Sequence, residues 1–252
     1  GLHLLNLELC DIAVTPTRWQ HSLHPEVYWD RIRVVHEGIN TGLLGPDTEA
    51  ELVLPSGKVL KAGQPVVTYV SRNLEPYRGF HIFMRSLPEI LRRHPSCEVV
   101  VVGGNEVSYG KRPEGFPDWK SRMLQECRVD PKRVHFLGKI PYDLYRKVLQ
   151  VSAAHVYLTY PFVLSWSMLE AMASGCLVVA SDTPPVREMI RSGENGLLVD
   201  FFNPAQLAEQ VLEVLEKPAA FSVLREAARH TVSACSIDRG NAAYRDMIME
   251  RP

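Results

Sequence analysis

Short hydrophobic runs recur along the chain and are largely uninterrupted by polar residues. Most are followed by a longer stretch in which apolar and polar residues recur with the period of a helix. Uninterrupted apolar runs of this length are typical of parallel strands that are buried on both faces. The expected strands are Val66–Val70, Glu98–Val102, Val134–Leu137, His155–Leu158, Leu177–Ala180 and Gly196–Val199.

The intervals between these runs predict helices. We expect them at Phe80–Arg93, Trp119–Glu126, Tyr142–Gln150, Trp166–Ser174 and Pro204–Leu215, with Asn203 as the N-cap of the last. This alternation predicts an α/β fold, in which a doubly wound parallel sheet of the Rossmann-like kind carries helices on both faces. Ligands bind such sheets at the carboxyl ends of the strands, so the site is sought in the loops after Val70, Val102, Leu137 and Leu158.

Composition divides the chain into four segments. Residues 1–42 contain short strand and helix patterns, and residues 43–64 are rich in Gly, Pro, Asp and Glu, as in a linker with a hairpin around Pro55–Gly57. Residues 65–220 hold the regular alternation, and residues 221–252 predict C-terminal helices. The chain starts at Gly1 rather than Met and runs at once into an apolar stretch, so we expect a piece of a longer protein.

The composition is that of an ordinary globular protein. Hydrophobic residues make up 46% and charged residues 23%, and the net charge of −1 gives no electrostatic case for nucleic-acid binding. No apolar run is long enough to span a membrane, which leaves only peripheral association open for the full-length protein. The five cysteines are scattered and never form a CxxC pair, so we expect free thiols and a cytoplasmic protein.

The loop after Val70 carries two arginines, Arg72 and Arg78, six residues apart and directly before Gly79. Two guanidinium groups at this spacing can hold a diphosphate bidentately. Two solvated arginines in a surface turn would have the same pattern, and the sequence of this loop alone does not separate the two interpretations.

Two further loops offer backbone groups rather than charges. Gly103 and Gly104 allow a ligand to approach the backbone, although a glycine pair is also ordinary turn chemistry. The GxGxxG fingerprint is missing, which weighs against a dinucleotide cofactor and hence against an oxidoreductase. Lys139 and Ile140 can meet the edge and face of a base, and the alternative is a plain turn between strand and helix.

The helix expected to begin at Trp166 is preceded by Ser165 and has Ser167 but no acidic residue in its first turn. Its unpaired N–H groups and its dipole therefore favour an anion. Glu170 lies one turn further along among apolar neighbours, where it suits the hydroxyls of a sugar. A phosphate and a ribose bound side by side would explain both features, whereas a solvated helix residue is the alternative for Glu170.

Other chemistries find little support. The nine histidines form no metal-type pairing with each other or with carboxylates, so we predict no metal site. Ser165-Trp-Ser-Met is not a GxSxG nucleophile elbow, which argues against a serine hydrolase.

Taken in their order along the chain, the segments that carry these candidate residues resemble the C-terminal, donor-binding half of the retaining GT-B glycosyltransferases of group 1, or family 4. The resemblance covers roughly residues 65–216, and residues 10–42 resemble the end of that family's N-terminal domain. It rests on Val70–Gly79, Val102–Gly104, Val134–Gly138, Leu169–Ala180, Ser181-Asp182, Val186–Glu188 and Gly193–Val199. It implies that most of the acceptor-binding domain is missing from this chain.

The resemblance also implies roles for the residues. Arg72 and Arg78 match the basic pair that holds the diphosphate, with Arg78 where lysine is usual, and Gly104 lies nearby. Glu170 matches the second glutamate of the Glu-x7-Glu motif, which binds the ribose. The remaining matches are Ser165, Trp166 and Ser167 for the amides that meet phosphate, and Lys139 and Ile140 for the base.

One position departs from the family pattern. Phe162 stands where the first glutamate of Glu-x7-Glu is expected, and Ser165-Trp166 replaces the usual pair of Gly and a hydrophobic residue. Because the first glutamate contacts the transferred sugar in this family, the departure leaves the donor sugar and the efficiency of transfer open.

The implied function is transfer of a hexose, with retention, from a nucleoside diphosphate sugar of the UDP or GDP type to a glycan, lipid or small molecule. No cofactor is implied beyond this donor substrate, and the chain alone is expected to be inactive. The alternatives are a non-catalytic nucleotide-sugar-binding or scaffold domain, for which Phe162 is the motive, and a sugar-nucleotide epimerase with the GT-B fold.

Overall fold

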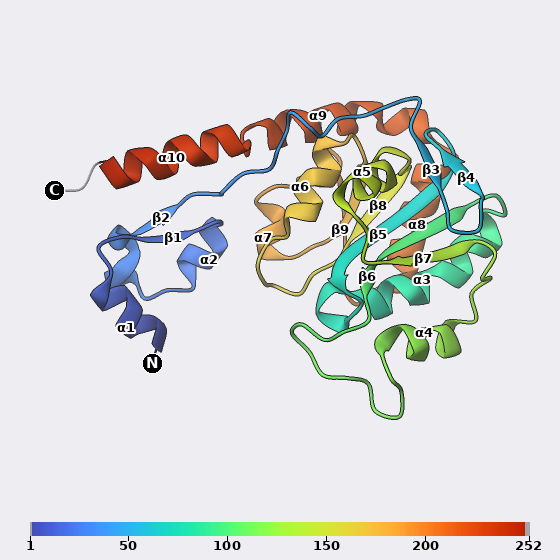
Figure 1. Ribbon diagram of the computed structural model, residues 1–252, viewed down its shortest axis with the longest axis horizontal. Helices are drawn as coiled ribbons and strands as arrows, with labels where there is room; N and C mark the ends of the chain where they lie inside the picture. The colour runs from blue at the N-terminus through green and yellow to red at the C-terminus, as the bar shows by residue number, and fades with distance from the viewer. Residues whose placement is uncertain (1, 250–252) are drawn as a thin grey trace.

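The computed structural model describes residues 2–249 and contains a main α/β domain, a small N-terminal unit and a long C-terminal helical segment (Figure 1). The main sheet is parallel throughout, with the order β10-β9-β8-β5-β6-β7. Its strands are β5 (Val66–Asn73), β6 (Glu98–Gly104), β7 (Val134–Gly138), β8 (Ala154–Tyr157), β9 (Leu177–Ser181) and β10 (Leu197–Val199). The expected doubly wound parallel sheet is therefore confirmed, with each strand within a few residues of its predicted bounds.

Both faces of this sheet are buried under helices, which explains why its strands are continuously apolar. Val99 and Val101 of β6 join one core cluster, whereas Val100 and Val102 join another on the opposite face. The first face is covered by α3 (Phe80–Arg93), α4 (Trp119–Cys127) and α8 (Pro204–Glu216). The second carries α5 (Tyr142–Gln150), α6 (Trp166–Ala173), the short α7 (Pro184–Arg187) and α9 (Ser222–Ser233).

Local signals of the sequence account for several element boundaries. The Asn203 side chain accepts the N–H of Gln206 at 2.9 Å, which confirms it as the N-cap of α8. After the short 3₁₀ helix η2 (Pro76–Arg78), Gly79 begins α3 with φ of 70°, a left-handed conformation that favours glycine. A Cβ atom at Gly79 would also overlap the side chain of Leu158, so glycine lets this turn pack against the end of β8.

The segment before the main domain contains two small paired elements. Strands β3 (Glu51–Val53) and β4 (Val59–Lys61) form the expected antiparallel hairpin, which covers part of the second sheet face beside α5. The N-terminal unit consists of α1 (Leu2–Leu9), α2 (Arg18–Ser22), the 3₁₀ helix η1 (Glu26–Arg31) and a parallel pair of strands, β1 (Ala13–Thr15) and β2 (Ile32–Val34). The division into four segments stays a prediction.

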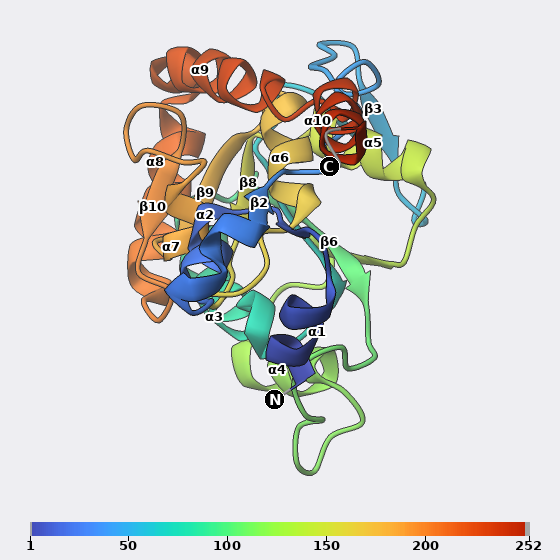
Figure 2. The ribbon, with the colours of Figure 1, turned by 90° about the vertical axis from the view of Figure 1, so that its left-hand side faces the viewer.

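The N-terminal unit lies on the side toward which the carboxyl ends of the main strands point (Figures 1 and 2). There the Glu188 carboxylate accepts the backbone N–H groups of Arg18 and Trp19, at 2.9 and 2.6 Å, at the start of α2. After the 3₁₀ helix η3 (Pro218–Phe221) and α9, helix α10 (Ile237–Met249) runs back along the linker toward this unit (Figure 1). Just before α10 begins, Ser236 forms an isolated parallel β-bridge with Ile39 of the linker.

All five cysteines lie within the described residues and are free, as expected, with Cys97 and Cys176 buried. Between residues 2 and 249, no helix combines the length and apolarity required to cross a membrane.

Candidate functional site

A cavity of about 360 Å³ opens at the carboxyl edge of the sheet, between the loops that follow β5 and β8. These strands are neighbours, but the chain proceeds from β5 to β6 on one side and reaches β8 on the other, which makes this position the topological switch point of the sheet. The cavity brings together these predicted site residues: Arg72, Arg78, Ser165, Trp166 and Ser167.

The two arginines lie in different environments. Arg72 is exposed at the cavity and, within residues 2–249, forms no ion pair. The Nη1 atom of Arg78 donates to Thr159 Oγ1 at 2.9 Å, to the carbonyl of Val163 at 3.1 Å and to the hydroxyl of Tyr157 at 3.3 Å. Because these bonds all use Nη1, the other donors of the guanidinium fork remain available to a ligand. Arg78 is thus a fixed cation and Arg72 an adjustable one.

Two aromatic rings flank Arg78, and one of them, that of Tyr109, lines the cavity. Its guanidinium carbon lies 5.3 Å from the ring centre of Phe162 and 5.7 Å from that of Tyr109. The two rings contact each other edge to face at 4.8 Å. The position at which the resemblance places a glutamate is therefore part of an aromatic wall, in which cation–π contacts hold the arginine.

Glu75 is a site residue that the sequence did not reveal. It lines the cavity but is only 1% exposed, and its Oε2 atom accepts the N–H groups of Tyr109 and Gly110 at 3.1 and 3.0 Å. Its other carboxylate oxygen, Oε1, is buried and has no hydrogen-bond partner in the part of the chain that the structure describes. Glu75 therefore fastens the long loop between β6 and α4 over the cavity. The partners lie more than thirty residues away in sequence, so no local pattern indicates them.

Helix α6 begins at the cavity wall, as predicted. The Ser165 hydroxyl accepts the N–H of Ser167 at 3.3 Å, and the N–H of Ser165 donates to the Tyr157 hydroxyl at 2.9 Å. The first turn has no acidic residue, so the positive end of the helix dipole faces the cavity, whose lining also includes the carboxylates of Glu37 and Glu75. The indole N–H of Trp166 donates to Glu37 of the linker at 2.9 Å, which ties the helix start to the segment leading to the N-terminal unit.

Glu170 is half-buried on the side of α6 that faces α5. Its two carboxylate oxygens accept the hydroxyls of Tyr142 and Tyr145 at 2.9 and 2.8 Å. Burial, followed by the nearby negative charge of Glu170, raises the pKa of Tyr142 to about 12 and also raises the pKa of Tyr145 well above its ordinary value, so both phenols stay protonated donors at neutral pH. Glu170 is therefore not the freely solvated residue of the alternative interpretation. It lies outside the lining of the cavity.

The remaining predicted residues lie on the neighbouring strand ends, around the cavity rather than inside it. A Cβ atom at Gly104 would overlap the side-chain ends of Asn73, Glu106 and Lys139, of which the last two are exposed and can move aside. Lys139 forms an exposed ion pair with Glu106 at 2.9 Å, and Ile140 packs half-buried beside α5. Among residues 2–249, no group of three metal-ligating side chains is placed to hold an ion, and the lack of a metal stays an expectation.

A doubly wound sheet with a cavity at its switch point places the protein among those with Rossmann-like α/β domains. Comparison with known proteins narrows this class. Residues 64–217 match the family model of the glycosyl transferases group 1, and residues 1–44 match that of the glycosyl transferase family 4 group. Since the first match covers more than half of the chain, the protein belongs to the group 1 glycosyltransferases, which have the GT-B fold.

Curated relatives agree with this assignment. The chain is 28% identical over 229 residues to the D-inositol 3-phosphate glycosyltransferase of Acidothermus cellulolyticus, which covers 88% of this chain and 49% of the relative. It is 31% identical over 186 residues to the phosphatidyl-myo-inositol mannosyltransferase of Mycobacterium tuberculosis, covering 71% of this chain and 42% of the relative. The chain thus spans half or less of the length of these relatives.

Solved structures share the fold. HepE from Anabaena, in complex with UDP-glucose, superposes with a TM-score of 0.76 at 16% identity, covering 96% of this chain and 64% of that protein. Sucrose-phosphate synthase from Thermosynechococcus elongatus gives a TM-score of 0.73 at 23% identity, covering 97% of this chain and 60% of that protein. Both likenesses extend over the N-terminal unit as well as the main domain.

Proposed function

We propose that the protein provides the donor-binding half of a glycosyltransferase that moves a hexose from a nucleoside diphosphate sugar to an acceptor with retention of configuration. The observation that carries this proposal is the convergence of Arg72, Arg78 and the start of α6 on one cavity. A diphosphate there meets two guanidinium groups and the positive end of a helix dipole, and few other ligands use all three.

The names of the relatives support this donor class. The curated relatives are glycosyl- and mannosyltransferases, and the HepE structures contain UDP or UDP-glucose. We therefore infer a UDP- or GDP-type donor, and an acceptor that is bound largely outside this chain. The absence of a cofactor other than the donor remains part of the proposal.

Stabilisation of the leaving group is the chemistry that these residues can perform. As the bond between sugar and diphosphate breaks, negative charge grows on the diphosphate, and fixed positive groups lower the energy of that state. Arg78 is held in place before the ligand arrives, which keeps the reorganisation small. A carboxylate accepts about four hydrogen bonds, so Glu170 can bind a ribose hydroxyl while Tyr142 and Tyr145 hold it.

Calorimetric titration of the protein with UDP, GDP and ADP tests the proposal. We expect one of the three to bind, and Arg72→Ala to weaken that binding about tenfold or more through loss of a charged hydrogen bond. Arg92→Ala serves as the matched control because Arg92 is an exposed helix residue whose ion pair is with Glu89, one turn away on the same helix. Failure of all three nucleotides to bind would contradict the proposal.

A second titration isolates the ribose contact. In the unchanged protein, a nucleoside diphosphate is expected to bind more tightly than its 2′,3′-dideoxy analogue. Glu170→Gln should remove most of this difference while leaving the affinity for the dideoxy analogue nearly unchanged. An undiminished preference for the ribose form in Glu170→Gln would show that Glu170 acts elsewhere. The non-catalytic alternative, motivated by Phe162, predicts the same binding but no transfer by the full-length protein.

A further inference from the structure

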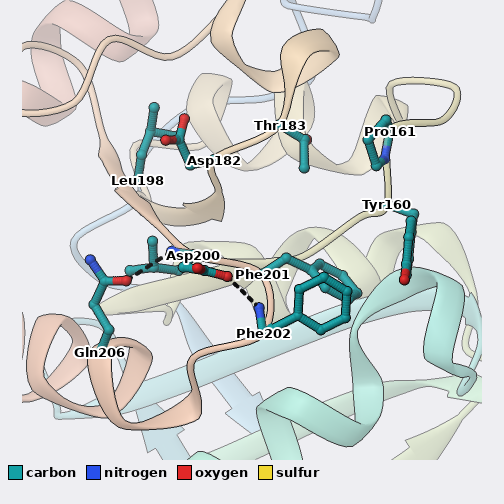
Figure 3. A pocket seen from close by; sticks show the side chains of 10 residues that line it. Tyr160, Pro161, Asp182, Thr183, Leu198, Asp200, Phe201, Phe202 and Gln206 are labelled. Carbon is teal, nitrogen blue, oxygen red and sulfur yellow. Dashed lines mark hydrogen bonds between the residues drawn. The ribbon is translucent and has the colours of Figure 1, made fainter.

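A second cavity, of about 470 Å³, lies at the same edge of the sheet on the outer side of the loop that follows β8 (Figure 3). Tyr160 and Pro161 of this loop line the second cavity, whereas Val163, Leu164 and Ser165 line the first. One loop is therefore a wall of both cavities. The volume is within the range of about 300–1,000 Å³ that small-molecule sites occupy.

Aromatic side chains form one wall of this cavity. Phe202 is 63% exposed and Tyr160 is 42% exposed, which is unusual for rings so close to a core. Each contacts the buried ring of Phe201 edge to face, with ring centres 5.0 and 4.9 Å apart (Figure 3). The exposed rings are thus held rigidly, so a ligand that packs on them loses little side-chain entropy.

Polar groups of fixed position face these rings. The Asp200 Oδ1 atom accepts the N–H of Phe202 at 2.7 Å, and Gln206 Oε1 accepts the N–H of Asp200 at 2.8 Å (Figure 3). These bonds set the orientation of both side chains and leave Oδ2 of Asp200 and the amide nitrogen of Gln206 for a ligand. On the opposite side, Asp182 is engaged by Arg187 through both carboxylate oxygens.

Thr183 provides an independent indication of a ligand. It lines the cavity, points toward it in Figure 3 and is only 5% exposed, yet its Oγ1 atom has no hydrogen-bond partner among residues 2–249. It occupies the N-cap position of α7, where threonine ordinarily caps the helix, but its side chain makes no capping bond. A buried hydroxyl without a hydrogen-bond partner is rare in folded proteins because it destabilises the fold, unless a ligand or a water molecule supplies the partner.

The geometry points to a site for the pyranose ring of a sugar, distinct from the donor cavity. The apolar face of a pyranose can pack on Phe202 and Tyr160, and its hydroxyls can reach Thr183, Asp200 and Gln206. A purely apolar ligand would leave these polar groups unpaired, which is unfavourable. An anionic ligand would face the carboxylate of Asp200, and none of the residues that line this cavity carries a positive charge. A neutral polyol with one apolar face can pack on the aromatic rings and also form hydrogen bonds with the polar groups opposite them.

This inference goes beyond the proposed function, and the sugar site itself does not depend on it, since the linings of the two cavities share no residue. Its position behind the loop after β8 suits a sugar unit of an acceptor glycan, and only this assignment to an acceptor rests on the proposed function.

Saturation-transfer difference NMR on the protein tests the site, with methyl α-D-glucopyranoside, methyl α-D-mannopyranoside and methyl β-D-galactopyranoside as probes. We expect at least one glycoside to bind, and the signal to persist in saturating UDP or GDP. Tighter binding of maltotriose than of the glucoside would identify a glycan chain as the source of the sugar, and equal binding would identify a single sugar unit. Both outcomes support the site.

Two variants locate the binding. Phe202→Ala removes the most exposed ring, and Thr183→Val replaces the unpaired hydroxyl by a methyl group of similar shape. Each is expected to weaken glycoside binding about fivefold. Thr183→Val should not lower the melting temperature, because it removes an unsatisfied polar group, and this separates a ligand contact from a structural role. Val223→Ala, at an exposed position of α9, is the matched control.

Three results would overturn the inference. The first is that none of the glycosides binds. The second is that both variants bind as the unchanged protein does. The third is that UDP or GDP abolishes the glycoside signal, which would place the sugar in the donor cavity. A failure of nucleotide binding alone would count against the proposed function and leave this site intact.

Discussion

Arg72 and Arg78 are six residues apart in sequence but differ in how firmly the protein holds them. Arg78 is anchored by three acceptors and two aromatic rings, whereas Arg72 extends into the cavity from the end of β5. A preorganised cation contributes more to a transition state than a mobile one, because no reorganisation is needed when charge develops. The two residues therefore have unequal expected roles, with Arg72 serving ligand capture and Arg78 serving the reaction.

For Arg78→Ala in the full-length enzyme, we expect turnover to fall at least about a hundredfold, by analogy with the removal of one donor to a developing anion. Arg78→Lys should retain part of the activity, since it keeps the charge but loses the fork that binds Thr159 and Val163. Steady-state measurement of kcat with the natural donor checks this. Near-normal turnover in Arg78→Ala would exclude a role of this residue in diphosphate stabilisation.

Among the elements, the turn from β5 into α3 matters most for the site. It places Arg78 directly before Gly79, whose left-handed conformation and close approach to Leu158 leave no room for a side chain. The geometry of the site is thus linked to the packing of a helix start on a neighbouring strand.

Gly79→Ala is expected to lower the free energy of unfolding by about 2 kcal/mol or more, through strain at positive φ together with the overlap with Leu158. Gly57→Ala is the matched control, because Gly57 has a similar φ of 84° but open space around its Cα. Gly57→Ala should lower the free energy of unfolding clearly less than Gly79→Ala does. Urea unfolding of both variants measures the difference, and equal losses would show that the contact with Leu158 contributes nothing.

The parallel strands and their helices could be predicted because each buried strand is a continuous apolar run and each helix has a distinct periodicity. Helix α1 was not expected, since its apolar residues lack a helical stripe, and Leu5 and Leu9 remain exposed. The loops of the site could be placed at one sheet edge from topology alone. The partners of Glu75, the phenols beside Glu170 and the second cavity depend on contacts between distant loops, which no local pattern encodes.

Two histidines of the molecule resist protonation, His155 because it is fully buried and His81 because it is half-buried beside Arg85. Burial lowers the pKa of His155 to about 3 and, together with Arg85, that of His81 to about 4. In the unfolded chain both have pKa values near 6.5, so between that pH and the folded-state values the unfolded chain binds more protons. Stability is therefore complete above about pH 6.5 and is lost as the pH falls below it.

Between pH 7 and pH 5, His155 alone should remove about 2 kcal/mol from the free energy of unfolding. Urea unfolding at a series of pH values measures this slope. It should be shallower in His155→Asn, whereas His230→Asn, which changes an exposed histidine, should leave it unaltered. The same slope in both variants would mean that other groups control the loss of stability in acid.

The return of α10 along the linker has a mechanical consequence. The N–H of Ile39 donates to the carbonyl of Cys235, and the N–H of Ile237 donates to the carbonyl of Ile39, both at 2.9 Å. The chain thus leaves the N-terminal unit and returns toward it through two segments fastened side by side. Rotation about a line through these segments needs only a few backbone torsions to change, as in a hinge. Twisting or sliding of one segment along the other would break both hydrogen bonds. We therefore expect opening over the sheet edge to be the easiest relative motion of the unit, once Glu188 releases the start of α2.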